Sequence, residues 1–143
     1  MDWTVDTQIL HKAAAVDMAA IGLLADILGQ RHGVGFDYEG QIRRQYENCV
    51  RSTRSEFIRK WVQEAADKLG QMRSGRLTER DREGLERLKF HRKDWAFVAV
   101  CSRTESKALV AEESDYTGEV RGYLSTEMGI SVFDVAGSLK RMG

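Results

Sequence analysis

Short apolar segments of strand length alternate with longer segments of helical periodicity, and this alternation limits the possible folds more than any other property of the sequence. It is clearest from Asp94 onward, where an apolar run at 95–101 is followed by strand-like residues 107–111, helical spacing over 120–128 and a last strand at 130–135. Such alternation predicts a mainly parallel sheet with helices on both faces. We therefore expect a single α/β domain, a three-layer α/β/α sandwich, over residues 1–143.

The N-terminal part of the chain shows the same alternation less regularly. Residues 3–10 predict a strand that ends at the polar pair Asp6-Thr7, and residues 34–37 predict a second strand. Between them, apolar residues recur at spacings of three and four, which predicts one amphipathic helix ended by Gly29 and Gly33. The apolar face of this helix comprises Leu10, Ala14, Met18, Ile21, Ala25 and Leu28.

The middle of the chain predicts further helices around a polar break. One helix begins near Gln41 and another covers residues 57–69. Residues 70–75 are polar and contain two glycines, which predicts a mobile loop. Thr78 with Asp81 three residues later resembles a capping box at the start of the next helix.

Charge is distributed unevenly, although 22 Lys and Arg balance 22 Asp and Glu over the whole chain. Residues 41–93 contain 15 basic and 8 acidic side chains, whereas the two flanks together contain 7 basic and 14 acidic ones. A basic region suits contacts with phosphate, and an acidic region suits a metal site. A solvated helical surface of mixed charge explains the basic region equally well.

Several properties of the sequence indicate a cytoplasmic protein. No apolar run approaches the roughly 18 residues that a membrane span requires. The first residues lack the basic and apolar regions of a secretory signal. The two cysteines, Cys49 and Cys101, make neither a disulfide framework nor a zinc motif.

Four carboxylates adjoin apolar segments. Asp6 interrupts a strand, Asp94 opens the apolar run at 95–101, and Glu113 and Asp115 follow a strand. Ligands of such sheets bind at the carboxyl ends of the strands. Burying several carboxylates together is costly unless a cation neutralises them, and hard oxygen ligands suit Mg²⁺ or Mn²⁺. These ions promote phosphodiester hydrolysis without a nucleophilic side chain.

Each acid also has a purely structural explanation. Asp6 suits a turn, Asp94 suits a helix N-cap, and Glu113 and Asp115 suit a solvated loop. No short motif links the four positions, and the three histidines have neither an obvious Ser or Cys partner nor metal-ligand spacing. The pattern of residues leaves both explanations open.

Four segments together resemble the PIN domain family. Val5-Asp6-Thr7-Gln8-Ile9-Leu10 resembles the family's opening strand end, and Lys93-Asp94-Trp95-Ala96-Phe97-Val98-Ala99 resembles the Asp before its Ala/Val-rich helix. Residues 109–116 (LVAEESDY) are similar to its late strand followed by acidic residues and an aromatic, and residues 129–134 are similar to its last strand. The resemblance covers most of the chain, is strongest from Asp94 onward, and favours a helix for residues 95–101.

The resemblance implies a PIN-like α/β/α domain with a carboxylate-lined pocket and Mg²⁺- or Mn²⁺-dependent endonuclease activity, on RNA rather than DNA. Many members are toxin or defence components held silent by a partner, so an inhibitory or activating protein partner is expected. A homodimer is a further expectation, because apolar helices of such domains often pair. By motif, Asp6 is the first acid, Asp94 the third, and Glu113 or Asp115 the fourth, while Thr7 orients Asp6 or a bound water.

The second acid of the family is replaced in this chain. It usually lies on the helix after the second strand, where this sequence has Gln45. Glu47 lies about 200° further around a helix and does not simply replace it. Gln45 and Glu47 are therefore candidate supporting residues. The same helix carries candidate phosphate contacts, or a solvated face, in Arg43, Arg44, Arg51 and Arg54.

Two functions follow from these features. The first is a metal-dependent endonuclease that uses Asp6, Asp94 and Glu113 or Asp115. The second is a non-catalytic PIN-like interaction module that binds a partner protein or nucleic acid, and Gln45 in the place of an acid favours it.

Overall fold

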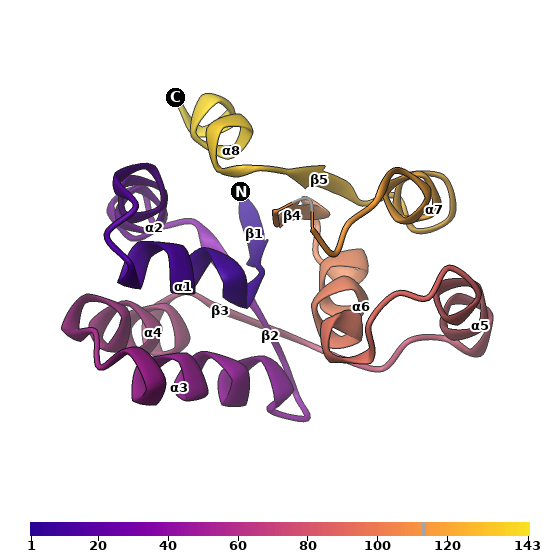
Figure 1. The fold of residues 1–143 in the computed structure, drawn as a ribbon, viewed down its shortest axis with the longest axis horizontal. Coiled ribbons are helices and arrows are strands. Elements are labelled where there is room, and N and C mark those ends of the chain that lie inside the picture. Colours follow the sequence, from indigo (N-terminus) through magenta and orange to yellow (C-terminus); the bar gives the residue numbers. More distant parts are fainter. Residues whose placement is uncertain (113) are drawn as a thin grey trace.

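A five-stranded, all-parallel sheet lies at the centre of the molecule (Figure 1). The computed structural model describes residues 1–112 and 114–143. Helices cover both faces of the sheet, which confirms the predicted α/β class and its three layers. In spatial order the strands are β3 (Gly70–Arg73), β2 (Gly33–Asp37), β1 (Asp2–Val5), β4 (Ala108–Val110) and β5 (Ser131–Phe133).

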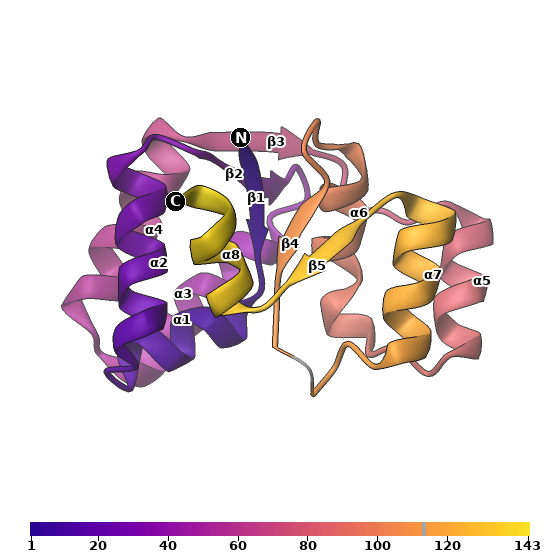
Figure 2. The ribbon, with the colours of Figure 1, turned by 90° about the horizontal axis from the view of Figure 1, so that it is seen from above.

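The helices are divided between the two faces of the sheet, and the C-terminal α8 lies on the face of the N-terminal helices (Figures 1 and 2). One face carries α1 (Thr7–Ala14), α2 (Met18–Gly29), α3 (Gln41–Thr53), α4 (Glu56–Lys68) and the C-terminal α8 (Val135–Met142). The other face carries α5 (Glu79–Arg87), α6 (Trp95–Arg103) and α7 (Gly118–Met128), with the short 3-10 helix η1 (Arg92–Asp94) leading into α6.

The three inner strands form the most deeply buried part of the sheet. Every residue of β2 and β4 is buried, and Trp3, Thr4 and Val5 are buried in β1. The edge strands β3 and β5 are only partly buried. Continuous burial of the inner strands is expected for a parallel sheet with helices on both faces.

Helix α6 packs against four of the five strands and is the central element of its layer. Residues 96–101 are all buried, so the helix is apolar on every side, as a core helix must be. A close approach at Gly35 in β2 makes this possible, because a Cβ atom there would lie 2.8 Å from Cγ1 of Val100. Deep packing of α6 fixes the position of its first turn, which carries Asp94.

The single helix predicted between Leu10 and Leu28 is wrong. The chain forms α1 and α2 with a break at residues 15–17, where Val16 has a φ of +64° and the Asp17 side chain accepts a hydrogen bond from the Ala20 N–H at 3.0 Å. The predicted apolar face is wrong as well, because Met18 is 71% exposed. The buried residues are instead Ile9, Leu10 and Ala13 in α1, and Ala20, Leu23, Leu24 and Ile27 in α2. The first strand ends at Val5, directly before the polar pair Asp6-Thr7 at which it was predicted to end.

Two further predictions are corrected at the edges of the sheet. Residues 70–75 do not form a loop throughout, because Gly70–Arg73 is the edge strand β3, paired with β2 from Val34 to Asp37. An edge strand can be polar because the sheet buries little of it. The last strand is shorter than predicted, and Asp134 begins α8 by accepting a hydrogen bond from the Gly137 N–H at 2.7 Å.

The other helices begin and end near the expected residues. In α3 the buried residues are Ile42, Tyr46 and Cys49. The Thr78 side chain accepts a hydrogen bond from the Asp81 N–H at 3.2 Å and caps α5. Within residues 1–112 and 114–143, no helix is both long enough and apolar enough to cross a membrane.

Candidate functional site

Asp6 directly follows the carboxyl end of β1 and directly precedes α1. Its backbone N–H donates to the Val110 carbonyl of β4 at 2.9 Å, which continues the β1–β4 pairing by one residue. Asp6 occupies the N-cap position of α1, but its side chain makes no capping hydrogen bond and is only 3% exposed. An Asp at this position usually caps its helix. The carboxylate of Asp6 is therefore buried without the usual structural reason.

Asp94 is also a buried N-cap residue without a capping hydrogen bond, and it lies in the helical layer on the other face of the sheet. It is the N-cap residue of α6, makes no side-chain capping bond and is 2% exposed. Its Oδ2 atom is buried and has no hydrogen-bond partner among the described residues. An unpartnered buried carboxylate oxygen is expensive, because water no longer solvates it. The predicted structural alternative, an ordinary N-cap, does not account for Asp94.

Asp37 shows what a buried structural carboxylate in the same sheet looks like. It ends β2 and is 1% exposed. Its Oδ1 accepts from the Ile42 N–H at 2.7 Å and its Oδ2 from the Gln41 N–H at 2.8 Å, so both oxygens cap α3. Neither Asp6 nor Asp94 caps its helix in this way, and the Asp94 Oδ2 atom has no partner at all among the described residues, which separates them from Asp37.

The loop after β4 brings a third carboxylate to the same place. Asp115 lines one cavity with Asp6 and Asp94. Glu112 is held away from it by an ion pair with Lys12 at 3.1 Å. Glu113, the other candidate for the fourth acid, lies outside the described residues.

This acidic cavity has a volume of about 190 Å³. Four segments far apart in the sequence form it: the β1–α1 junction with the first turns of α1, helix α3, the η1–α6 junction and the loop after β4. We call it the acidic cavity below. Its lining residues are Asp6, Thr7, Gln8, His11, Gln45, Lys93, Asp94 and Asp115.

Burial and mutual repulsion make the two deepest carboxylates hold their protons unusually strongly. Burial, then the charge of Asp94, raises the pKa of Asp6 to about 7, although the nearby N–H groups of Gln8 and Thr7 lower it in part. Burial, then the charge of Asp115, raises the pKa of Asp94 to about 6, against a smaller opposing effect of Lys93. An ordinary aspartate has a pKa of about 3.9. Near neutral pH the site therefore favours a bound cation or a bound proton.

Gln45 connects the two layers at this cavity. Its Oε1 accepts from the Thr7 hydroxyl at 3.2 Å, and its Nε2 donates to the Lys93 carbonyl at 2.8 Å. The amide thus ties the start of α1 to η1, the segment that carries Asp94. Thr7 was predicted to orient Asp6 or a water, but its hydroxyl orients Gln45.

Sequence reasoning missed four residues of this region. Lys93, Gln8 and His11 line the acidic cavity, and Tyr116 lies buried close to its three aspartates. The Tyr116 hydroxyl has no partner among the described residues, and burial and the aspartate charges raise its pKa well above the ordinary value. Gln8, Lys93 and Tyr116 lie within the segments that resemble the PIN family, and this is the signal that could have found them.

The acidic cavity fits a hard divalent cation in its donor chemistry. No group of three His, Cys, Asp or Glu side chains within residues 1–112 and 114–143 is close enough to hold a metal ion together. Mg²⁺ does not require one, because it usually keeps several waters and binds through one or two carboxylates. The unpartnered Oδ2 of Asp94 and the buried carboxylate of Asp6 supply such oxygens.

The predicted arginines and Glu47 lie elsewhere. Arg43 pairs with Glu47 at 3.0 Å, and both line a separate groove between α3 and α4. Arg44, Arg51 and Arg54 are exposed on or after α3, and Arg51 bonds to Asn48. None of these five side chains lines the acidic cavity.

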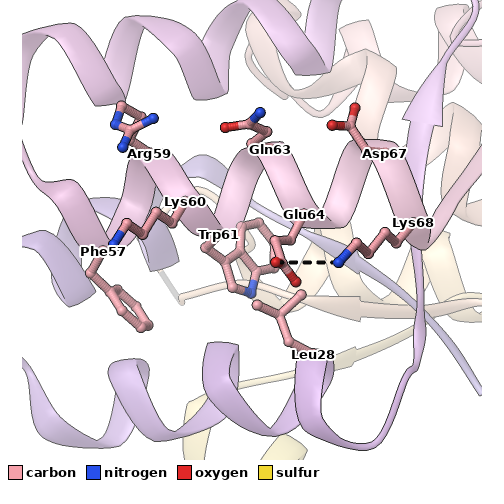
Figure 3. Close-up of a pocket in the computed structure, with 9 residues that line it drawn as sticks. All are labelled: Leu28, Phe57, Arg59, Lys60, Trp61, Gln63, Glu64, Asp67 and Lys68. Carbon is pink, nitrogen blue, oxygen red and sulfur yellow. Dashed lines mark hydrogen bonds and ion pairs between the residues drawn. The ribbon is translucent and has the colours of Figure 1, made fainter.

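A larger cavity, about 710 Å³ in volume, lies over α4 and the end of α2 (Figure 3). Leu28 lies beside Trp61 at its apolar floor, and charged side chains surround it. Glu64 pairs with Lys68 at 3.5 Å, and the Trp61 Nε1–H donates to the Leu24 carbonyl at 2.8 Å. No buried polar group in it lacks a partner within the described chain, so the acidic cavity carries the stronger chemical argument.

Comparison with known proteins gave no match. No family model, curated protein or solved structure is significantly similar to the chain. The resemblance to the PIN family therefore stays a prediction from the sequence segments.

Proposed function

We propose that the protein is a metal-dependent endonuclease of the PIN type that hydrolyses phosphodiester bonds, in RNA rather than DNA, in the cytoplasm. One observation carries the proposal: Asp6 and Asp94 are buried in one cavity, neither caps its helix, and one oxygen of Asp94 has no partner. Keeping such carboxylates is costly unless a ligand offsets their charge. Mg²⁺ or Mn²⁺ is the ligand that their chemistry suits best.

Residues of this chain have separate tasks in the proposed site. Asp6 and Asp94 would supply the oxygen ligands of the cation, and Asp115 lines the same cavity. When bound, the cation would lower the pKa of a coordinated water and offset charge on the phosphodiester. Gln45 holds η1 and the start of α1 together through its two hydrogen bonds, so it is a positioning residue. Lys93 lies on the cavity wall, where its ammonium group attracts a phosphate anion.

Cleavage assays with purified protein test this proposal. Labelled single-stranded and structured RNA, and DNA of the same sequence, are incubated with Mn²⁺ or Mg²⁺, and Asp6→Asn and Asp94→Asn are compared with the wild type. Asp67→Asn, on the exposed surface of α4, is the matched control. The proposal predicts metal-dependent cleavage that only the first two variants lose. A wild type that cuts nothing, or equal cleavage by all variants, contradicts it.

A second candidate function is a non-catalytic PIN-like module that binds a protein or a nucleic acid. The hydrogen bonds of Gln45 favour this function, because the oxygen and the nitrogen of its amide are both bonded within the protein. An acid at this position would add a charge that the present site lacks. Binding of RNA without any cleavage under all metal conditions would favour this function over the first.

A further inference from the structure

A second cavity lies beside the acidic one and has the opposite charge. Its volume is about 310 Å³, and it lies between the start of α3, the segment that joins β3 to α5, and the start of α6. Three of its lining residues are arginines and none is acidic, and we call it the basic cavity. It is lined by Gln41, Gly75, Arg76, Leu77, Arg82, Arg92 and Trp95.

The two cavities adjoin each other along two elements. Lys93 and Asp94 line the acidic cavity, and their chain neighbours Arg92 and Trp95 line the basic one. On α3, Gln45 lines the acidic cavity and Gln41, one helical turn earlier, lines the basic one. The four residues from Gln41 to Gln45 rise about 6 Å along the helix axis. A polyanion bound in one cavity is therefore within reach of the other.

Arg92 is the arginine best placed to take a new ligand. Its guanidinium lies 5.3 Å from the centre of the Trp95 ring, and no carboxylate of the described chain forms an ion pair with it. A guanidinium stacked on a ring keeps its N–H donors at the edge free for an anion, often in a bidentate arrangement with phosphate. The Trp95 indole is itself fixed, since its Nε1–H donates to the Phe90 carbonyl at 3.3 Å.

Acidic residues around the basic cavity hold the other two arginines only loosely. Arg82 pairs with Glu86 at 3.0 Å and Glu79 at 3.5 Å, while Arg76 pairs with Glu39 at 3.6 Å. Arg76 is 84% exposed and Glu79 is 80% exposed, and exposed ion pairs are weak. A phosphate group can therefore compete for both guanidinium groups.

We propose that the basic cavity binds a backbone phosphate of the nucleic-acid strand. This phosphate is adjacent, along the same strand, to the phosphodiester held at the acidic cavity. This inference rests on the proposed nuclease function and assigns its substrate contacts to Arg76, Arg82 and Arg92. They replace the arginines of α3 that the sequence suggested. The line that joins the two cavities then sets the path of the strand across the site.

Fluorescence of Trp95 gives a direct test, because Trp3 and Trp61 are at most 1% exposed and report little of the surface. A short single-stranded RNA is titrated into the full chain in EDTA, where no cleavage can occur, and inorganic phosphate is titrated in parallel. Arg92→Gln is expected to weaken RNA binding about tenfold and to reduce the salt slope by about one. Arg59→Gln, on the exposed surface of α4, is the matched control and is expected to bind as the wild type does.

Each outcome has a defined meaning. RNA-dependent change of the Trp95 signal that Arg92→Gln weakens and Trp95→Phe abolishes supports the proposal. Equal affinity of wild type and Arg92→Gln, or binding of inorganic phosphate as tight as that of RNA, overturns it. If the wild type cleaves RNA while Arg92→Gln binds normally, only this inference fails. If RNA binds through Arg92 and no metal produces cleavage, the nuclease function fails.

Discussion

The acidic and basic cavities are neighbours of opposite charge, and they differ most in burial. Asp6 and Asp94 are almost completely buried, whereas Arg76 and Arg92 are exposed. A buried charge lowers stability unless a ligand offsets it, while an exposed arginine costs little. The buried acids are therefore the stronger evidence for function. The exposed arginines support a binding function only because they lie beside these acids.

Loss of the acidic cavity's charge should have the largest effect. Asp94→Asn keeps the shape of the side chain but removes the charge that holds the cation, so we expect RNA cleavage to fall by about 10²–10³-fold, equivalent to about 3–4 kcal/mol. The rate of cleavage under saturating Mn²⁺ measures this. A residual activity close to that of the wild type would mean that the acidic cavity is not the site of chemistry.

Stability of the metal-free protein should depend on pH in an unusual direction. Unfolded Asp6 releases its proton near pH 4, and folded Asp6 releases it near pH 7, so the folded state binds more protons between these values. Its contribution to stability is fully present below about pH 4 and is lost as the pH rises through about 7. Asp6→Asn should therefore raise the free energy of unfolding at pH 8 by about 2–4 kcal/mol, which urea denaturation in EDTA measures.

Urea denaturation with Mn²⁺ in place of EDTA separates the wild type from Asp6→Asn more clearly. The cation should restore stability to the wild type at pH 8 and leave Asp6→Asn nearly unchanged, because binding to the folded state adds free energy. Asp37→Asn is an informative comparison, since both oxygens of Asp37 cap α3 and its replacement should lower stability at every pH. A wild type whose stability rises between pH 5 and 8 in EDTA would disagree with this account.

Gln45→Glu should have an intermediate effect. A glutamate accepts the Thr7 hydrogen bond but cannot donate to the Lys93 carbonyl, and it adds a charge to the acidic cavity. We expect the metal-free protein to lose about 1–3 kcal/mol of stability, and Mn²⁺ to bind more tightly. Thermal unfolding with and without Mn²⁺ checks both effects, and Gln45→Met separates the lost hydrogen bonds from the added charge.

Changes at the α3–α4 groove should have the smallest effect. Glu47→Gln breaks an exposed ion pair with Arg43, which contributes about 0.3–0.5 kcal/mol on a helix. RNA affinity and cleavage should stay within a factor of two of the wild type, measured in the assays above. A large loss in this variant would move the substrate path to α3 and away from the basic cavity.

Much of the fold could be predicted because the main helices and inner strands carry their own periodicity. The buried residues of α3 recur at helical spacing, and β4 is a short apolar run before a polar segment. The break between α1 and α2 could not be predicted from spacing, because the apolar positions continue across it. Strand β3 was missed because an edge strand needs no apolar pattern when its partner β2 supplies the pairing.

The acids of the candidate site could be located because they adjoin buried segments. Asp6 follows β1 and Asp94 begins α6, so a parallel fold places both near the carboxyl ends of strands. The basic cavity could not be predicted in the same way. Arg76, Arg82 and Arg92 come from separate segments of a region rich in arginine, and only the packing of α5 and α6 selects these three.

Calorimetric titration of the metal-free protein with Mn²⁺ at pH 8, for wild type and Asp94→Asn, tests the central claim most directly. The account predicts that the wild type binds the ion, that binding weakens at pH 5.5 as Asp6 and Asp94 take up protons, and that Asp94→Asn loses it. Absence of binding to the wild type, or equal binding to both proteins, would contradict the claim that these buried carboxylates hold a cation.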